Sequence, residues 1–173
     1  IAWLYGSTQV VFDKFEPEEF VDDLAKEAVS VIFLVPTMVN LMIQHPNFDP
    51  AKLATIKTIN MGGSSIAASK LQQAIALTGP IFAQIYGQVE APMSITMMPK
   101  KELGSRLESC GRTGLFVDIK IVDDKGKEVA DGEIGEIICK GSLVMQGYWN
   151  NEKATAETLK DGWLHTGDLG WKS

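Results

Sequence analysis

Apolar runs and amphipathic stretches alternate along the first 110 residues, a pattern that predicts strands and helices in turn. The run Val29–Val35 is nearly continuous in apolar and β-branched residues, as in a strand buried on both faces of a parallel sheet. A helix is predicted before it, starting at Pro17, a residue that suits the first helical turn. Its apolar residues share one helical face: Phe20, Val21, Leu24 and Ala28.

The same alternation continues on both sides of this unit. Thr37 is expected to cap a helix that runs to about Gln44, after Pro36 ends the strand. Further strands are predicted at Gln9–Phe12, Ile56–Met61 and Ile81–Tyr86, with a tight turn at Gly62–Ser65 and a helix at Ala67–Leu77. Alternating strands and helices predict a parallel sheet with crossover helices.

After about Cys110 the pattern changes to closely spaced strands. Residues 117–122 alternate imperfectly at period two, and Glu133–Lys140 predicts another strand, with turn signals at Asp124–Gly126 and Asp131-Gly132. Strands without intervening helices predict an antiparallel sheet or small barrel. The expected fold class is therefore α/β, with an α/β subdomain over residues 1–110 and a smaller β-rich subdomain over residues 111–173.

Composition narrows the functional classes. The chain has 173 residues, 45% of them apolar and 22% charged, and a net charge of −6, which disfavours disorder and a nucleic-acid partner. Two cysteines without metal spacing indicate reduced thiols in a cytoplasmic protein. The longest apolar run is too short to span a bilayer, and no basic amphipathic helix indicates membrane association.

Candidate chemistry follows two of the predicted parallel strands, because ligands bind outside the carboxyl ends of such strands. One loop is Gly62–Ser65, whose glycines let a backbone approach a ligand, although such a turn is usually only a turn. The other is Tyr86–Glu90. Tyr86 offers a flat face for a base, and Glu90 offers a hard oxygen ligand for Mg²⁺.

A third polar stretch, DGWLHTGDLGW, occupies residues 161–171. Asp168 has the acceptor capacity to bind two hydroxyls of a ribose, and the alternative is an aspartate that caps a turn. His165 is expected to be a structural hydrogen-bonding residue rather than a base. No catalytic nucleophile with a partner base is evident.

Taken in this order, the three stretches resemble motifs of the adenylate-forming superfamily, in particular acyl-CoA synthetases. MGGSSI is similar to the Gly-Gly-Ala-Pro turn of that family, and YGQVE is similar to its Tyr-Gly-x-Thr-Glu motif. The segments GEIICKGSLVMQGYWNNEKAT and GWLHTGDLG also resemble family motifs, so the match spans roughly residues 58–170.

The resemblance implies a two-step reaction. A carboxylic acid and ATP give acyl-AMP and pyrophosphate, and coenzyme A then displaces AMP. By this resemblance Glu90 holds Mg²⁺ and Asp168 binds the ribose hydroxyls of ATP or AMP. The other implied nucleotide-binding positions are Gly63, Ser64 and Ser65 along the adenine, Tyr86 stacked on it, and Gly87 and Val89 of the same motif as Tyr86. The acid is expected to be a fatty or aryl acid.

Two positions depart from the family pattern, namely Val89 and, more mildly, Ser64-Ser65 in place of Ala-Pro. Val89 stands where the family has a threonine whose hydroxyl bonds the phosphate. No catalytic residue is assigned within the chain, because the family's phosphate loop precedes these motifs and its catalytic lysine follows them. The chain is therefore expected to be an internal piece of a ligase, inactive by itself. Two alternatives stay open: a ligase that loads a carrier protein, and a non-catalytic relative that binds nucleotide or acyl-AMP.

Overall fold

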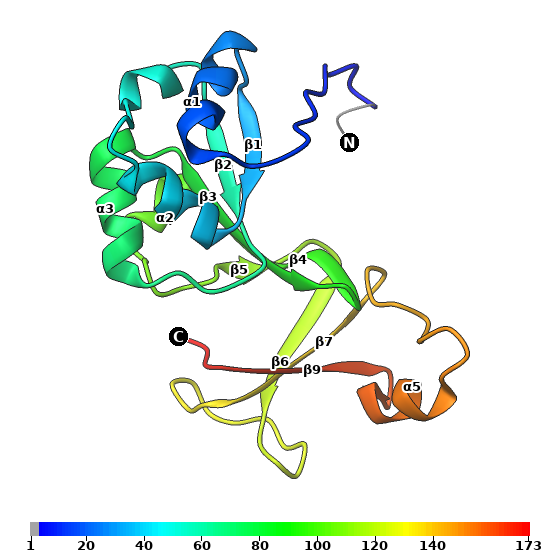
Figure 1. Cartoon of the computed structure of the whole chain (residues 1–173). Helices are drawn as coiled ribbons and strands as arrows, with labels where there is room; N and C mark the ends of the chain where they lie inside the picture. Colours follow the sequence, from blue (N-terminus) through cyan, green and yellow to red (C-terminus); the bar gives the residue numbers. More distant parts are fainter. Residues whose placement is uncertain (1–3) are drawn as a thin grey trace. The chain divides into compact units, whose positions relative to one another are not determined.

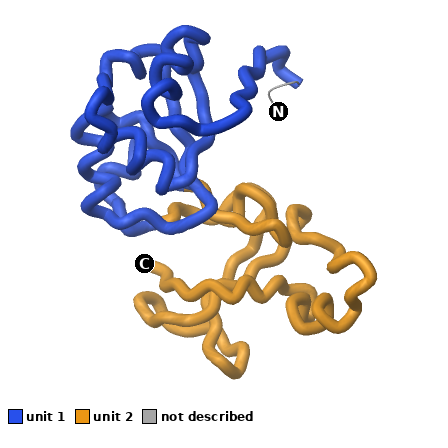
Figure 2. Tube along the Cα trace, in the orientation of Figure 1, with its two compact units in different colours: residues 1–84, 98–109 blue, residues 85–97, 110–173 orange. Residues whose placement is uncertain are grey.

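The computed structural model describes residues 4–173 and contains two β-sheets with surrounding helices (Figure 1). The chain divides into two compact units (Figure 2). Unit 1 comprises the residues up to Gln84 together with Met98–Ser109, and unit 2 comprises Ile85–Met97 and Cys110–Ser173. Residues 85–97, which the sequence pattern groups with the first subdomain, are thus counted with the second unit.

Unit 1 has the parallel sheet with crossover helices that the sequence predicts. Its strands are β1 (Val31–Leu34), β2 (Thr58–Met61) and β3 (Phe82–Gln88), paired in parallel in that order, and β3 continues into unit 2. Its helices are α1 (Pro17–Lys26), α2 (Pro36–Gln44), η1 (Pro50–Leu53), α3 (Ala68–Thr78) and α4 (Lys100–Leu103). Gly79 ends α3 with a positive φ of 82°, as expected of a helix-terminating glycine.

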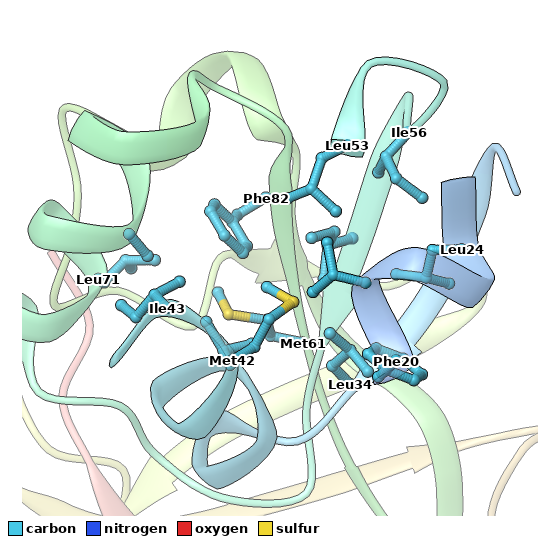
Figure 3. Close-up of a cluster of buried hydrophobic side chains, with 14 of the residues drawn as sticks. Phe20, Leu24, Leu34, Met42, Ile43, Leu53, Ile56, Met61, Leu71 and Phe82 are labelled. Carbon is cyan, nitrogen blue, oxygen red and sulfur yellow. The ribbon is translucent and has the colours of Figure 1, made fainter. Parts of the chain in front are cut away.

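The core of unit 1 lies between the helices and one face of β1–β3 (Figure 3). Leu34 on β1, Met61 on β2 and Phe82 on β3 are each at most 1% exposed. Leu24 of α1 and Met42 of α2 pack into the same cluster and have no exposed surface. Burying each such side chain contributes about 1.5–3 kcal/mol, so this packing holds the helices against the sheet.

Three local expectations for this region were wrong. Strand β1 is not buried on both faces: Val31 and Phe33 are 57% and 44% exposed, because the core cluster covers only the face that carries Leu34. Residues 9–12 form no strand, since they have no ladder partner and β-propensity alone does not provide one. The N-cap of α2 is Val35, which makes no side-chain cap bond, and Pro36 and Thr37 lie inside the helix.

Unit 2 is built mainly on an antiparallel sheet. Its strands are paired in the order β6-β7-β9-β8, namely Val117–Val122, Gly135–Gly141, Trp163–Gly170 and Leu159–Lys160. Helix α5 (Glu152–Thr158), most of β4 (Ala91–Met98) and the short β5 (Arg112–Thr113) complete the unit. The predicted α/β fold class, with a parallel part and an antiparallel part, is confirmed.

The core of unit 2 joins β4 to this sheet. Ala91 and Ile95 of β4 pack with Val117 of β6, Cys139 of β7 and Leu164 of β9. Cys139 and Leu164 are fully buried and face each other in the ladder. Burial raises the pKa of the Cys139 thiol to about 11, so this cysteine stays protonated and unreactive.

Residues 4–173 contain neither a disulfide bond nor a candidate membrane-spanning helix. Both cysteines in this range are free. No helix in the same range combines the length and the hydropathy needed to cross a bilayer.

Candidate functional site

Tyr86 and Asp168, which lie 82 residues apart in sequence, meet in unit 2. Tyr86 lies near the end of β3 and Asp168 near the end of β9. The Tyr86 hydroxyl donates a hydrogen bond of 2.6 Å to Oδ2 of Asp168. The structure therefore brings together the two residues that the sequence assigns to the adenine and the ribose.

The electrostatics of this pair leave a free acceptor. Burial raises the pKa of Tyr86, and the hydrogen bond to Asp168 raises it further, so the phenol stays protonated as a donor. Asp168 is exposed, and Oδ1 accepts no hydrogen bond from any residue between 4 and 173. Oδ1 can accept hydrogen bonds from hydroxyls of a bound ligand, while Tyr86 holds Oδ2 in place.

The segment predicted as a turn around Asp168 lies within strand β9, where its pairing with β7 is irregular between Glu136 and Ile138, and hydrogen bonds to β7 hold it. The Asp168 N–H donates to Thr166 Oγ1 at 3.1 Å, and the Thr166 hydroxyl donates to the Ile137 carbonyl at 2.6 Å. The Gly167 N–H donates to Glu136 Oε1 at 3.0 Å. Gly167 has a φ of 74°, a conformation that glycine adopts without strain. The polar sequence around Gly167 therefore positions Asp168.

His165 makes the structural hydrogen bond expected of it. Its Nδ1 lies 2.7 Å from Glu136 Oε2, and both side chains are partly buried. Because the carboxylate accepts, Nδ1 carries the hydrogen in this arrangement. Burial raises the pKa of Glu136, but the hydrogen bonds from His165 and Gly167 outweigh burial and lower it overall. Glu136 thus acts as an ionised anchor for this segment of β9.

We expect Glu136→Gln to destabilise the fold in a pH-dependent way. The pKa of Glu136 in the folded state lies below the ordinary value of 4.5. Its contribution to the free energy of unfolding is therefore present above that value and is lost as pH falls through the folded pKa. Urea unfolding should show a loss of about 1–2 kcal/mol at pH 5 that is smaller at pH 3.

Glu108→Gln is the matched control, because Glu108 is exposed and no hydrogen bond of its side chain is seen within residues 4–173. An equal effect of Glu136→Gln at both pH values would refute the ionised-anchor role.

The segment Tyr86–Glu90 differs from the loop that the sequence predicts. Strand β3 continues through Gln88, and only Val89 and Glu90 form the turn that leads into β4. A Cβ atom on Gly87 would lie 2.7 Å from the backbone nitrogen of Met93, so the adjacent strand already requires this glycine. Val89 is 92% exposed at the tip of the turn. The role of Gly87 and Val89 toward a nucleotide stays a prediction.

Glu90 has a partner that sequence reasoning missed. The Tyr148 hydroxyl donates to Glu90 Oε1 at 2.7 Å, across 58 residues of sequence. Glu90 also lines a polar pocket of about 320 Å³, together with Tyr148 and Lys160. Three residues of β9 that precede Asp168, namely His165, Thr166 and Gly167, line the same pocket. Two of the predicted motifs therefore border one cavity within unit 2.

The donor set around Glu90 fits magnesium in one particular mode. Residues 4–173 contain no group of three or more histidine, cysteine, aspartate or glutamate side chains that would hold a metal. Mg²⁺ is commonly bound by one or two carboxylates, with phosphate oxygens and waters completing its shell. A single partly buried carboxylate with one oxygen already hydrogen-bonded, as at Glu90, suits a cation that arrives with phosphates.

The predicted Gly-Gly turn is present in unit 1. Gly63, Ser64 and Ser65 follow β2, and all three are exposed. Gly63 has a φ of 86°, and a Cβ there would lie 3.4 Å from Val35 Cγ1, an ordinary contact. The backbone conformation, rather than crowding, therefore explains the glycine. The role of this turn along an adenine stays a prediction.

Comparison with known proteins identifies the family. The family of AMP-binding enzymes matches residues 1–149. The medium/long-chain-fatty-acid–CoA ligase FadD8 of Mycobacterium tuberculosis is 43% identical over 165 residues, which cover 95% of this chain and 29% of that protein. A feruloyl-CoA synthase of an Amycolatopsis species is 33% identical over 166 residues, covering 96% of this chain and 34% of that protein.

A solved structure is also similar. The o-succinylbenzoate–CoA synthetase MenE of Bacillus subtilis, in complex with its acyl-adenylate intermediate, has a TM-score of 0.87 and 30% identity, covering 98% of this chain and 34% of that one. The chain thus spans about a third of the length of each of these proteins. From the family match over residues 1–149 and this structural similarity, the chain belongs to the family of AMP-binding enzymes.

Proposed function

We propose that the intact protein containing this chain is an ATP-dependent acid–CoA ligase. In the first step a carboxylate oxygen attacks the α-phosphorus of ATP, and the bond to pyrophosphate breaks as acyl-AMP forms. In the second step the coenzyme A thiolate attacks the acyl carbon, a C–S bond forms, and AMP leaves. AMP is a better leaving group than the oxide that a free carboxylate would have to lose, which is why the acid is activated before the thiol reacts.

The Tyr86–Asp168 hydrogen bond is the observation that supports this proposal most strongly. It joins two separate family motifs at one place and leaves Asp168 Oδ1 open. We assign the ribose hydroxyls to Asp168 and the adenine face to Tyr86, with Gly63, Ser64 and Ser65 along the adenine. Glu90 would hold Mg²⁺, which supplies charge neutralisation on the phosphates when bound.

The substrate class is a carboxylic acid, fatty or aryl, as in the names of the similar proteins. ATP–pyrophosphate exchange by the intact protein, run over a panel of fatty and aryl acids, tests this class directly. We expect exchange with at least one acid, followed by AMP release on addition of coenzyme A. If AMP were released only with a phosphopantetheinyl carrier protein, that protein rather than coenzyme A would be the acceptor. Nucleotide binding without exchange on any acid would favour the non-catalytic alternative.

Residues 1–173 alone are expected to release no pyrophosphate from ATP with any acid. These residues span only about a third of the length of the similar ligases, and no catalytic residue is assigned among them. A colorimetric pyrophosphate assay of the 173-residue polypeptide tests this, with the intact protein as the positive control. Release above the enzyme-free background would contradict it.

Restoring the family residue at the hairpin tip is expected to accelerate acyl-AMP formation. Val89 is 92% exposed, so a threonine fits there without repacking, and its hydroxyl can donate to a phosphate. One hydrogen bond to a charged group is worth about 1.5–3 kcal/mol, or roughly ten- to a hundredfold in rate. Single-turnover formation of acyl-AMP by Val89→Thr measures the gain, and Val89→Ala controls for the loss of the valine. An unchanged or slower rate in Val89→Thr would refute the missing-donor account.

A further inference from the structure

The segment Met145–Tyr148 holds Glu90 through both its backbone and its side chain. The Met145 N–H donates to the Glu90 carbonyl at 2.8 Å. The Tyr148 hydroxyl donates to Glu90 Oε1 at 2.7 Å. The second bond is not required to fix the backbone, because the first already ties the hairpin turn to this segment. Its distinct effect is on the orientation of the carboxylate.

The position of Tyr148 is itself set from α5. The Tyr148 N–H donates to Thr155 Oγ1 at 2.9 Å, and the Thr155 hydroxyl donates to the Asn151 carbonyl at 2.8 Å. Gly147 lies so close to this site that a Cβ on it would come within 2.9 Å of Thr155 Cγ2. Asn151 caps α5 by accepting from the Ala154 N–H. The tyrosine therefore approaches Glu90 from an anchored backbone.

This arrangement leaves one Glu90 oxygen available. Oε1 accepts from Tyr148, whereas Oε2 accepts no hydrogen bond from residues 4–173. Both side chains line the polar pocket of about 320 Å³.

We propose that Tyr148 is a positioning residue for Glu90: its hydroxyl holds Oε1 so that Oε2 faces a divalent cation bound with the phosphates of ATP. The proposal rests on the function proposed above. Hydrogen bonds to a metal-binding carboxylate fix its orientation, and their loss commonly lowers metal affinity about 10–100-fold. Because Tyr148 is 37% exposed, we expect the lower end of that range here.

The experiment measures cation binding rather than turnover. Mn²⁺ serves as the probe, with the intact protein and the non-hydrolysable analogue α,β-methylene-ATP, and electron paramagnetic resonance reports free Mn²⁺. The variants are Tyr148→Phe, Glu90→Gln and the double variant. Tyr148→Phe keeps the ring and the backbone bond to Thr155. Tyr5→Phe is the matched control, since Tyr5 is 79% exposed and does not line the pocket.

We expect Tyr148→Phe to raise the Mn²⁺ dissociation constant about tenfold, with Tyr5→Phe unchanged. Glu90→Gln should raise it further, and the double variant should match Glu90→Gln, because Tyr148 acts only through Glu90. A purely structural role would instead give losses that add in full.

Wild-type Mn²⁺ binding in Tyr148→Phe, or full additivity in the double variant, would overturn the proposal. Wild-type binding in Glu90→Gln would overturn it as well, because Glu90 would then hold no cation. Failure of the ligase assignment is recognised separately: the Mn²⁺ results would hold while no acid supports pyrophosphate exchange.

Discussion

Replacing Asp168 with alanine in the intact protein is expected to weaken ATP binding about a hundredfold. Asp168 offers a carboxylate whose Oδ2 is fixed by Tyr86 and whose Oδ1 is open. Two ribose hydroxyls donating to it would each contribute about 1.5–3 kcal/mol, and exposure to solvent places the total near the lower limit. Isothermal titration calorimetry with ATP measures the loss directly.

Two further variants make this result specific. Tyr86→Phe removes the phenolic hydroxyl but keeps the ring face, so ATP affinity should fall only a few-fold, by less than in Asp168→Ala. Asp124→Ala alters an exposed turn aspartate and should leave affinity unchanged. If a folded Asp168→Ala protein binds ATP within threefold of wild type, Asp168 does not bind the ribose.

Gly114→Ala is expected to destabilise unit 2 by about 3–4 kcal/mol. The added methyl group would clash with backbone atoms, and such a clash is relieved only by shifting the backbone. A Cβ on Gly114 would lie 2.0 Å from the carbonyl oxygen of Ser94 and 3.1 Å from its carbon. The Gly114 N–H also donates to the Ile95 carbonyl at 2.9 Å, so the segment cannot move away without losing that bond. For a polypeptide of 173 residues, the melting temperature should fall by roughly 6–16 °C.

Gly104→Ala is the matched substitution for this experiment. Gly104 has ordinary helical dihedral angles, and no atom lies within 4 Å of a Cβ built there. Alanine at such a site should be neutral or stabilising by up to about 1 kcal/mol, through the unfolded state. Comparable losses in the two variants would mean that the close approach at Gly114 does not govern stability.

Local sequence signals predicted the elements that have their own start signal and a regular apolar pattern. Helix α1 follows from Pro17 and the apolar face of Phe20, Val21 and Leu24, all three of which are buried. Strand β4 was missed, because Ala91–Met98 contains a proline and its burial does not alternate regularly. Its place between β3 and β5 in the five-stranded sheet β1-β2-β3-β4-β5, rather than its own pattern, makes it a strand.

Residues of the candidate site were predictable only where they belong to a recognisable sequence motif. Tyr86, Glu90 and Asp168 were expected from their motifs, and the hydrogen bond between the first and the last agrees with their expected proximity. Tyr148 was not expected, because 58 residues separate it from Glu90 and nothing near either residue signals the contact. Glu136 escaped notice for the same reason, since its bonds to His165 and Gly167 depend on the pairing of β7 with β9.

A crystal structure of the intact protein with bound AMP tests the central claim most directly. The account predicts both ribose hydroxyls within about 3 Å of the Asp168 carboxylate, with the adenine against the ring of Tyr86. Density for the nucleoside at any other place, with the Asp168 carboxylate facing only solvent and Tyr86, would contradict it.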